Sequence, residues 1–195
     1  KLPRIAELLL GSVNPRQLMA GMLLGIVAGS FVIFSIYAVG GLFVAQRNGW
    51  DIPIDWTQMP WFLVSQVLGV LLFSSIFLTI GAAVSELKEA QSLLFPVWMM
   101  LMIPMMVWFV AVRDPNGPVA TSLSFFPPST PLMMTLRIAS GQTIPAWQPP
   151  AAALLMLVAT FIVVSIAARI YRASLLKSDS AASFAKIFQR LRAAE

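Results

Sequence analysis

The chain has 195 residues and a net charge of +5; 58% of its residues are hydrophobic, only 11% are charged, and the mean hydropathy is +0.83. This balance lies outside the range of soluble domains and indicates a membrane protein. The chain contains no cysteine and no histidine. Without cysteine, this sequence can form no disulfide and bind no metal through a thiolate. Without histidine, it lacks the commonest general base and metal ligand.

Four long apolar stretches predict four membrane-spanning helices, because about 20 apolar residues suffice to cross the hydrocarbon core. The predicted spans cover residues 18–45, 62–84, 92–112 and 151–172. The first carries Gly21, Gly25 and Gly29 on one helix face. We expect this face to pack against another helix of the bundle, with self-association as the alternative.

The second and third spans carry residues that predict local roles. Gln66 is the most polar side chain in any span. We expect it to form a hydrogen bond to another helix; the alternative is that it lines a transport path. Pro96 and Pro104 predict kinks in the third span. That span also holds a methionine cluster, which we assign to adaptable packing and not to copper, because no cysteine or histidine accompanies it. The cluster comprises Met99, Met100, Met102, Met105 and Met106.

Amphipathic helices are predicted at both ends of the chain. Residues 1–17 predict a short cytoplasmic helix that breaks at Gly11 and turns into the first span at Pro15. It is either an interfacial anchor or a docking surface for a soluble partner. Residues 173–195 predict a basic amphipathic helix, which we expect to lie on an anionic leaflet. Its apolar positions are Phe184, Ile187, Phe188 and Leu191.

The segment at residues 119–142 is too apolar for a free loop and too rich in proline to span the membrane. Non-helical backbone at membrane depth requires a cover of protein or water. We therefore predict a re-entrant or interfacial helical hairpin that caps the bundle. We expect a short helix that ends near Gly141. Its apolar side is expected to consist of Leu132, Met133, Leu136 and Ile138.

The charges predict the orientation. The two ends of the chain and the turn at residues 85–91 together carry the whole net charge of +5, whereas the loops on the other side sum to zero. The positive-inside rule places both ends in the cytoplasm of a multi-pass protein of the cell membrane. A basic face on an anionic leaflet accounts for the charge, and no nucleic-acid partner is expected.

No catalytic motif is present: the sequence contains no GxxxxGK[ST], HExxH or GxSxG pattern. No span has an acid or base at its centre, which disfavours a proton relay or an ion-coupled carrier. We predict no catalytic residue, no metal site and no bound cofactor in this chain. The predicted fold class is an all-α membrane protein: a four-helix transmembrane bundle at 18–172, with the helical hairpin and the two amphipathic ends.

Four stretches, in this order, resemble type-two ABC exporter permeases, especially the NatB-like, sodium-efflux-type branch. They are ELLLGSVNPRQLMAGMLLG from residue 7, SELKEAQ from 85, SFFPPSTPLMMTLRIASG from 124 and ARIYRASLL from 168. The resemblance implies a permease that pairs with a separate ATPase subunit, which binds the ATP and magnesium. It also implies a homodimer or a pair of permeases.

The resemblance further implies three groups of site residues. A coupling helix would fit a groove on the ATPase through Glu7, Leu8, Leu9 and Leu10, with Pro15, Arg16 and Gln17 at its exit. A second cytoplasmic turn would contain Glu86 and Glu89. An external gate would contain Phe126, Pro127, Pro128, Pro131 and Arg137.

One departure from the family pattern is the number of spans. Family members have six spans and usually a large external domain, so we expect the first span, that domain and the second span to lie upstream of Lys1. The alternative functions are a non-transporting membrane scaffold that recruits soluble partners and, less favoured, a channel-like pore. The resemblance points to sodium as cargo, while organic, peptide and lipid cargo stay open.

Overall fold

The structure is a computed structural model that describes residues 15–50, 56–84 and 86–192, with side chains described from Gln17 to Arg172 within these ranges. Every regular element in this part of the chain is a helix. In chain order the helices are α2 (Pro15–Arg47), α3 (Met59–Ala83), α4 (Leu87–Arg113), α5 (Pro118–Ser124), α6 (Thr130–Ala139) and α7 (Gln148–Arg192).

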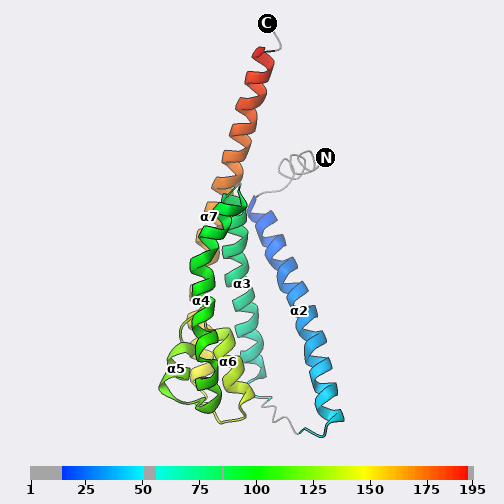
Figure 1. Cartoon of the computed structure of the whole chain (residues 1–195), viewed down its shortest axis with the longest axis vertical. Coiled ribbons are helices and arrows are strands. Elements are labelled where there is room, and N and C mark those ends of the chain that lie inside the picture. The colour runs from blue at the N-terminus through cyan, green and yellow to red at the C-terminus, as the bar shows by residue number, and fades with distance from the viewer. Residues whose placement is uncertain (1–14, 51–55, 85, 193–195) are drawn as a thin grey trace.

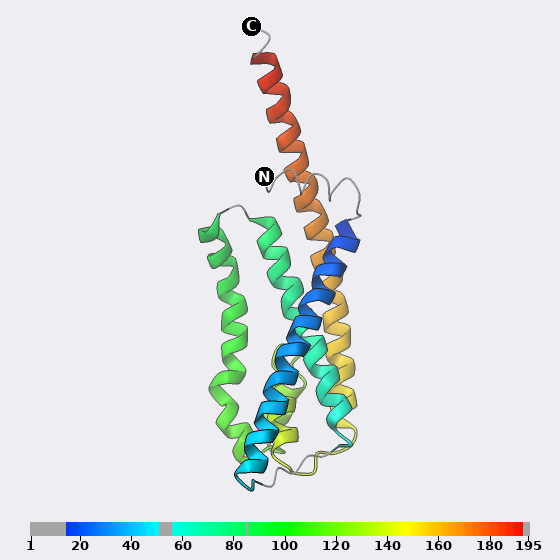
Figure 2. The same cartoon turned by 90° about the vertical axis from the view of Figure 1, so that its right-hand side faces the viewer.

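Four of these helices are long and apolar enough to cross a membrane, which confirms the four predicted spans. The spans run over Gln17–Arg47, Met59–Ala83, Leu87–Arg113 and Gln148–Arg172. The start of α2, the turn between α3 and α4, and the far part of α7 lie at one end of the bundle (Figure 1). The short helices α5 and α6 lie at the other end of the bundle (Figure 2).

The centre of the bundle is the pair α3 and α7, which make the most extensive helix–helix contact. The buried residues of both helices are mostly small: Ser65, Gly69, Ser75 and Thr79 on α3, and Ala152, Ala153, Thr160 and Ala167 on α7. Small side chains let helix backbones approach closely in lipid, where apolar burial itself gains little. The hydroxyls stay satisfied, because Ser75 donates to the Leu72 carbonyl and Thr160 donates across the pair to the Leu68 carbonyl at 3.4 Å.

The glycines of α2 do not take part in this packing. A Cβ atom added at Gly21, Gly25 or Gly29 would meet nothing within 4 Å in the part of the chain that is described. Only 6% of the span in α2 is buried, against 33% in α3. Our expectation that this face packs within the bundle is therefore not met in these residues, and self-association stays a prediction.

The helix α4 starts earlier than expected. Residues from Leu87 onward are already helical, so most of the predicted turn at 85–91 is the first turn of α4. The helix continues through both Pro96 and Pro104. The methionines of the cluster are exposed on its surface, from Met100 at 38% to Met106 at 72%.

The helix α7 continues without a break from its span to Arg192. The tail that we expected to lie along a leaflet instead leaves the bundle along the axis of α7 (Figure 1). A helix needs a breaker to turn, and no glycine or proline follows Pro150 in the sequence.

Candidate functional site

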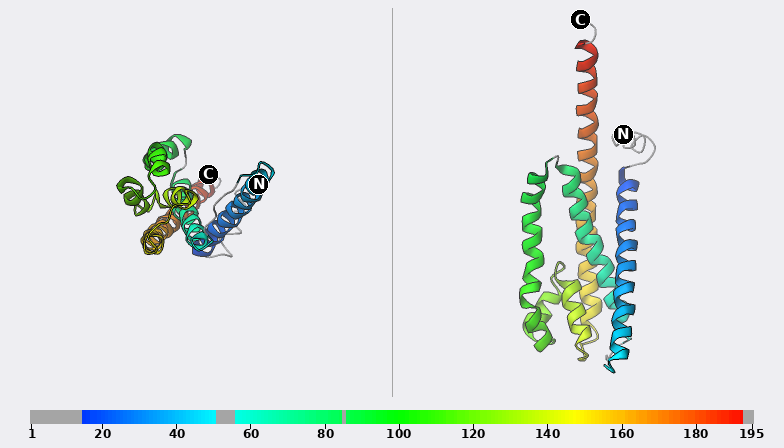
Figure 3. Two further views of the ribbon diagram at one scale, coloured as in Figure 1. Left: turned by 90° about the horizontal axis from the view of Figure 1, so that it is seen from below. Right: turned by 45° about the vertical axis from the view of Figure 1, so that its right-hand side comes forward.

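Residues 114–148 form a compact unit at one end of the bundle, which we call the helical cap. It contains α5, α6 and the turns around them, and it contacts α3, α4 and α7 (Figure 3). The two helices occupy the segment for which we predicted a hairpin at 119–142, and its depth in the bilayer stays a prediction. The α6 helix ends at Ala139, and Gly141 follows with a φ of 68°, close to the predicted end.

Proline and hydroxyl residues set the boundaries of the two cap helices. Pro118 and Pro131 lie in the first turns of α5 and α6, where a missing N–H costs no helical hydrogen bond. The turn between them is held by side chains: Ser129 Oγ donates to the Leu123 carbonyl at 2.6 Å, and Thr130 Oγ1 donates to the Ser124 carbonyl at 2.9 Å. The helices are therefore fixed to each other by more than their backbone connection.

Arg137 is the centre of the cap. Its side chain is 0% exposed and is the largest fully buried side chain in the described part of the chain. The Nε atom donates to the Pro115 carbonyl at 2.6 Å, and Nη1 donates to Ser124 Oγ at 3.1 Å. The Nη2 atom donates to Asn116 Oδ1 at 3.3 Å and also to Gln148 Oε1. One side chain thus joins the α4–α5 turn, α5, α6 and the start of α7.

All the hydrogen-bond acceptors around Arg137 are neutral. No carboxylate forms an ion pair with it among the described residues, so desolvation is not offset by an opposite charge. Burial accordingly lowers the pKa of the Arg137 guanidinium from its ordinary value. A buried charge is tolerated when hydrogen bonds replace the lost water, and the four acceptors do this.

Gln66 and Gly69 connect the cap to α3. Gln66 Nε2 donates to Thr135 Oγ1 at 2.7 Å and to the Pro131 carbonyl at 3.2 Å, so the predicted bond across helices is present. A Cβ atom added at Gly69 would lie 2.6 Å from Pro131 Cγ. Only glycine allows α6 to approach α3 this closely.

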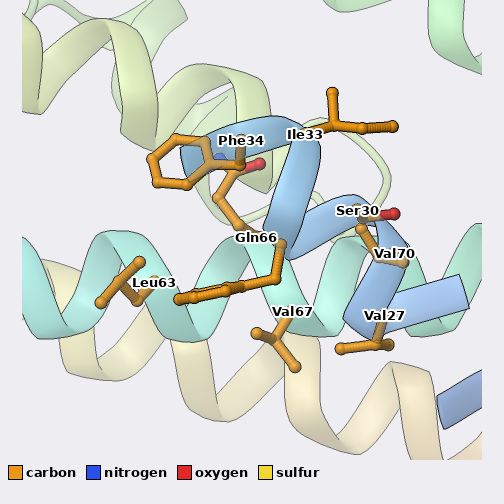
Figure 4. A pocket seen from close by; sticks show the side chains of 9 residues that line it. Val27, Ser30, Ile33, Phe34, Leu63, Gln66, Val67 and Val70 are labelled. Atoms are coloured by element: carbon orange, nitrogen blue, oxygen red, sulfur yellow. The ribbon is translucent and has the colours of Figure 1, made fainter. Parts of the chain in front are cut away.

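Several cavities lie side by side along the outer face of α3. One of about 270 Å³ between α2 and α3 is lined by residues that include Ser30, Phe34 and Gln66 (Figure 4). The next, of about 520 Å³, reaches α4 and the cap, and also has Ser30 and Gln66 in its wall. Two more, of about 580 and 300 Å³, share Phe77 with it and continue to Gly81. We call this chain of cavities the α3 groove; no charged side chain lines it.

The family model described as ABC-2 family transporter protein matches residues 1–170, which include the cap and nearly all of the four spans. The chain belongs to the ABC-2 transporter family. The chain is therefore a multi-pass membrane component of the kind found in ABC transporters.

Two curated relatives are similar to this ABC-2 protein. YhaP of Bacillus subtilis, itself described as an uncharacterized protein, is 26% identical over 207 residues, covering 100% of this chain and 49% of YhaP. MJ1024 of Methanocaldococcus jannaschii, also described as uncharacterized, is 29% identical over 139 residues, covering 71% of this chain and 34% of MJ1024. The chain thus spans half or less of the curated relatives that it matches. No solved structure matches it significantly.

The gate residues implied by the resemblance lie in the cap but in different surroundings. Phe126 is 38% exposed, Pro127 and Pro128 are partly buried, Pro131 lies against α3, and Arg137 is buried. The buried side of α6 is formed by Thr130, Met133, Met134 and Arg137. We expected the apolar side of this helix to consist of Leu132, Met133, Leu136 and Ile138. Of these four residues, only Met133 is buried, and the other three are partly buried.

Part of the predicted coupling surface lies outside the described residues, namely Glu7, Leu8, Leu9 and Leu10. Pro15 and Arg16 form the first turn of α2, and Gln17 is exposed. Glu86 precedes α4 and Glu89 lies in its first turn, where carboxylates interact favourably with the helix dipole. The starts of α2 and α4 lie at the same end of the bundle (Figure 1).

Sequence reasoning missed the partners of Arg137, above all Ser124 and Gln148, and the contact at Gly69. A signal for the first was present: Arg137 is the only charged residue between Asp114 and Arg169. Such an isolated charge in an apolar stretch must find polar partners nearby.

No group of three or more His, Cys, Asp or Glu side chains that suits a metal ion occurs in the part of the chain that is described.

Proposed function

We propose that this chain is the membrane part of the permease subunit of an ABC exporter. A separate ATPase subunit binds and hydrolyses ATP with magnesium, and the permease converts the closure of that subunit into a movement of its spans. The observation that carries the proposal is the family match across residues 1–170. Such a mechanical role requires no catalytic motif in the permease itself.

The ATPase is proposed to act on the first residues of the chain. Glu7, Leu8, Leu9 and Leu10 form the contact surface on a coupling helix, and Pro15, Arg16 and Gln17 pass its movement to α2. Support comes from the packing of α2, whose span is only 6% buried in the described chain, so that few buried residues hold it to the pair of α3 and α7. Glu86 and Glu89 are proposed to form the second contact, at the start of α4.

The helical cap is proposed to be the external gate. Phe126, Pro127, Pro128, Pro131 and Arg137 belong to one hydrogen-bonded unit that is attached to α3 through Gln66. A tilt of α3 would therefore move the cap as a body. The permease is proposed to work as a homodimer or as a pair with a second permease, in the cytoplasmic membrane, with both ends of this chain in the cytoplasm.

Sodium is the cargo that the resemblance to the NatB-like branch favours. The four cavities of the α3 groove offer no carboxylate for a bare cation, because no charged side chain lines them. Organic, peptide or lipid cargo is equally compatible with the proposed mechanism.

Replacing Leu8 by Asp tests the proposal. A carboxylate on the apolar face of the coupling helix should weaken binding of the ATPase, and we expect at least a tenfold loss of ATPase that co-purifies with the permease. Membrane insertion should be unchanged, because Leu8 lies outside the four spans of this chain. The matched control is Leu8→Met, which keeps the apolar face. Undiminished co-purification of the Asp variant would reject the docking role, and the absence of any ATPase with the wild type would favour a scaffold.

A further inference from the structure

The cavity of about 520 Å³ in the α3 groove lies between four different helices, and we call it the cap cavity. Its walls come from α2, α3 and α4, and Pro131 and Leu132 of α6 complete them. Binding sites for small molecules typically measure about 300–1,000 Å³ and are mostly apolar with a few polar groups. The cap cavity has this size and this composition.

The apolar walls of the cap cavity suit a ligand with a flat apolar body. Aromatic rings and methionines are prominent in them, namely Phe73 and Phe77 on α3 and Trp98, Met102 and Met105 on α4. Aromatic rings stack on flat apolar groups, and the flexible methionine side chain adapts to irregular shapes. These walls therefore accept an apolar body without demanding one particular outline.

Three polar groups in the same walls have no hydrogen-bond partner in the described part of the chain. The hydroxyls of Ser30 and Ser74 make no bond there, whereas Ser75 donates to the backbone of its own helix. Gln66 donates to the cap through its amide nitrogen, but its carbonyl oxygen accepts no bond from these residues. Ser74 lies about 12 Å further along α3 than Gln66. A ligand with a hydroxyl or an amide N–H can therefore form a hydrogen bond at either of two places in the cavity.

No charged side chain lines the cap cavity. A charged ligand would lose its water there without meeting an opposite charge, which is costly. An uncharged ligand loses only the hydration of its polar group, and the Ser30 hydroxyl or the Gln66 carbonyl replaces that hydration. The cavity therefore favours uncharged ligands over ions, sodium included.

We propose that the cap cavity binds the cargo of the exporter, and that this cargo is an uncharged, mainly apolar organic molecule with a hydroxyl or amide donor. That the ligand is cargo rests on the proposed function, whereas binding itself does not. The contact of the cavity with the proposed gate supports this role. Pro131 lies in its wall, and Gln66 bonds to the Pro131 carbonyl at 3.2 Å. A ligand on Gln66 thus contacts the side chain that attaches the cap to α3.

Photolabelling of the full-length protein in lipid nanodiscs tests the proposal with a matched pair of compounds. The uncharged compound, p-(hydroxymethyl)benzophenone, has one hydroxyl, and p-benzoylbenzoate has a carboxylate in its place. Irradiated benzophenones react readily with methionine, and mass spectrometry identifies the labelled residues. We expect the uncharged compound to label Met102 and Met105 about tenfold more than Met99 and Met106. The last two are exposed on the same helix and line none of the four cavities of the groove. The carboxylate compound should show no such preference.

The variant Ser30→Trp tests the place of binding, because its indole ring fills space beside Gln66. It should abolish the preference for Met102 and Met105. The matched control is Ser35→Trp on the same helix, which should keep the preference, since Ser35 lines none of the four cavities of the groove. A further measurement needs no variant: p-methylbenzophenone lacks the hydroxyl and should label the two methionines about fivefold less than the hydroxymethyl compound.

Equal labelling of all four methionines would show that the compound only dissolves in the bilayer, and this would overturn the proposal. The same preference from the carboxylate compound would overturn it as well. Labelling needs neither ATP nor an ATPase, so it can confirm the site even if no ATPase co-purifies and the proposed exporter function fails. In the complex with the ATPase, the uncharged compound should raise the rate of ATP hydrolysis by the wild type but not by the Ser30→Trp variant. Labelling without this stimulation would overturn the cargo role alone.

Discussion

At the scale of single residues, this chain concentrates its polar chemistry in very few side chains. Arg137 bonds to Pro115, Ser124, Asn116 and Gln148 and so holds the cap together. The planar fork of the guanidinium can reach four acceptors in different directions, which an ammonium group on a Lys side chain cannot do. The cap is therefore sensitive to the shape of this residue as well as to its charge.

We predict that Arg137→Met destabilises the cap by about 3 kcal/mol, because it leaves buried acceptors without donors. Arg137→Lys should also destabilise the protein, since it keeps the charge but loses most of the bonds. The measurement is the melting temperature of the purified protein in detergent. Arg113→Met is the control, because Arg113 is exposed at the end of α4 and should tolerate the change. An unchanged melting temperature for both Arg137 variants would show that the network is dispensable.

At the scale of helices, the distribution of small residues decides which spans touch. The face of α3 that carries Ser65, Gly69, Ser75 and Thr79 is buried, whereas the glycine face of α2 is open. Both faces are rich in small residues, yet only the first has neighbours in the described chain. Small residues permit close approach, but they do not specify the partner.

We predict opposite effects for alanine at the two kinds of glycine. Gly69→Ala should destabilise the protein by about 1–3 kcal/mol, because the new Cβ would overlap with the ring of Pro131. Gly25→Ala adds a methyl group to open space and should be neutral or slightly stabilising, since alanine favours a helix. Thermal unfolding of the two variants in the same detergent measures both effects. Equal stability of the Gly69 variant and the wild type would contradict the tight contact between α3 and α6.

At the scale of the whole molecule, the helices place most of the charged segments at the same end of the bundle. The beginning of α2, the α3–α4 turn and the far part of α7 are at one end, and the cap is at the other (Figure 2). Most of the Lys and Arg residues in the described part of the chain belong to the segments at the first of these ends. On the positive-inside rule, we propose that this end faces the cytoplasm and that the cap lies outside.

We predict that labelling of single cysteines in intact cells will show this orientation. The chain has no cysteine of its own, so each introduced one is unique within these 195 residues. A membrane-impermeant maleimide should label Asn48→Cys and Gln142→Cys from outside, and Glu86→Cys only after permeabilisation. All three positions are exposed in the structure. Labelling of Glu86→Cys in intact cells would reverse the proposed topology and with it the site of ATPase contact.

The sequence by itself determined the class of the protein, the number of spans and their approximate limits. These properties depend only on the length and polarity of local stretches. The hydrocarbon core is about 30 Å thick, so an apolar stretch of about 20 residues is enough to predict a helix that crosses it. The short helix ending near Gly141 was also predictable, because glycine at positive φ is a local signal.

Only the tertiary structure decided which surfaces meet. The pairing of α3 with α7, the contact of Gly69 with Pro131 and the four acceptors of Arg137 join residues that lie 11 to 92 positions apart. Side-chain periodicity identifies a face but not its partner, since in lipid many apolar faces are equally good candidates. The choice depends on close approach and on satisfying buried polar groups, and both are properties of the assembled bundle.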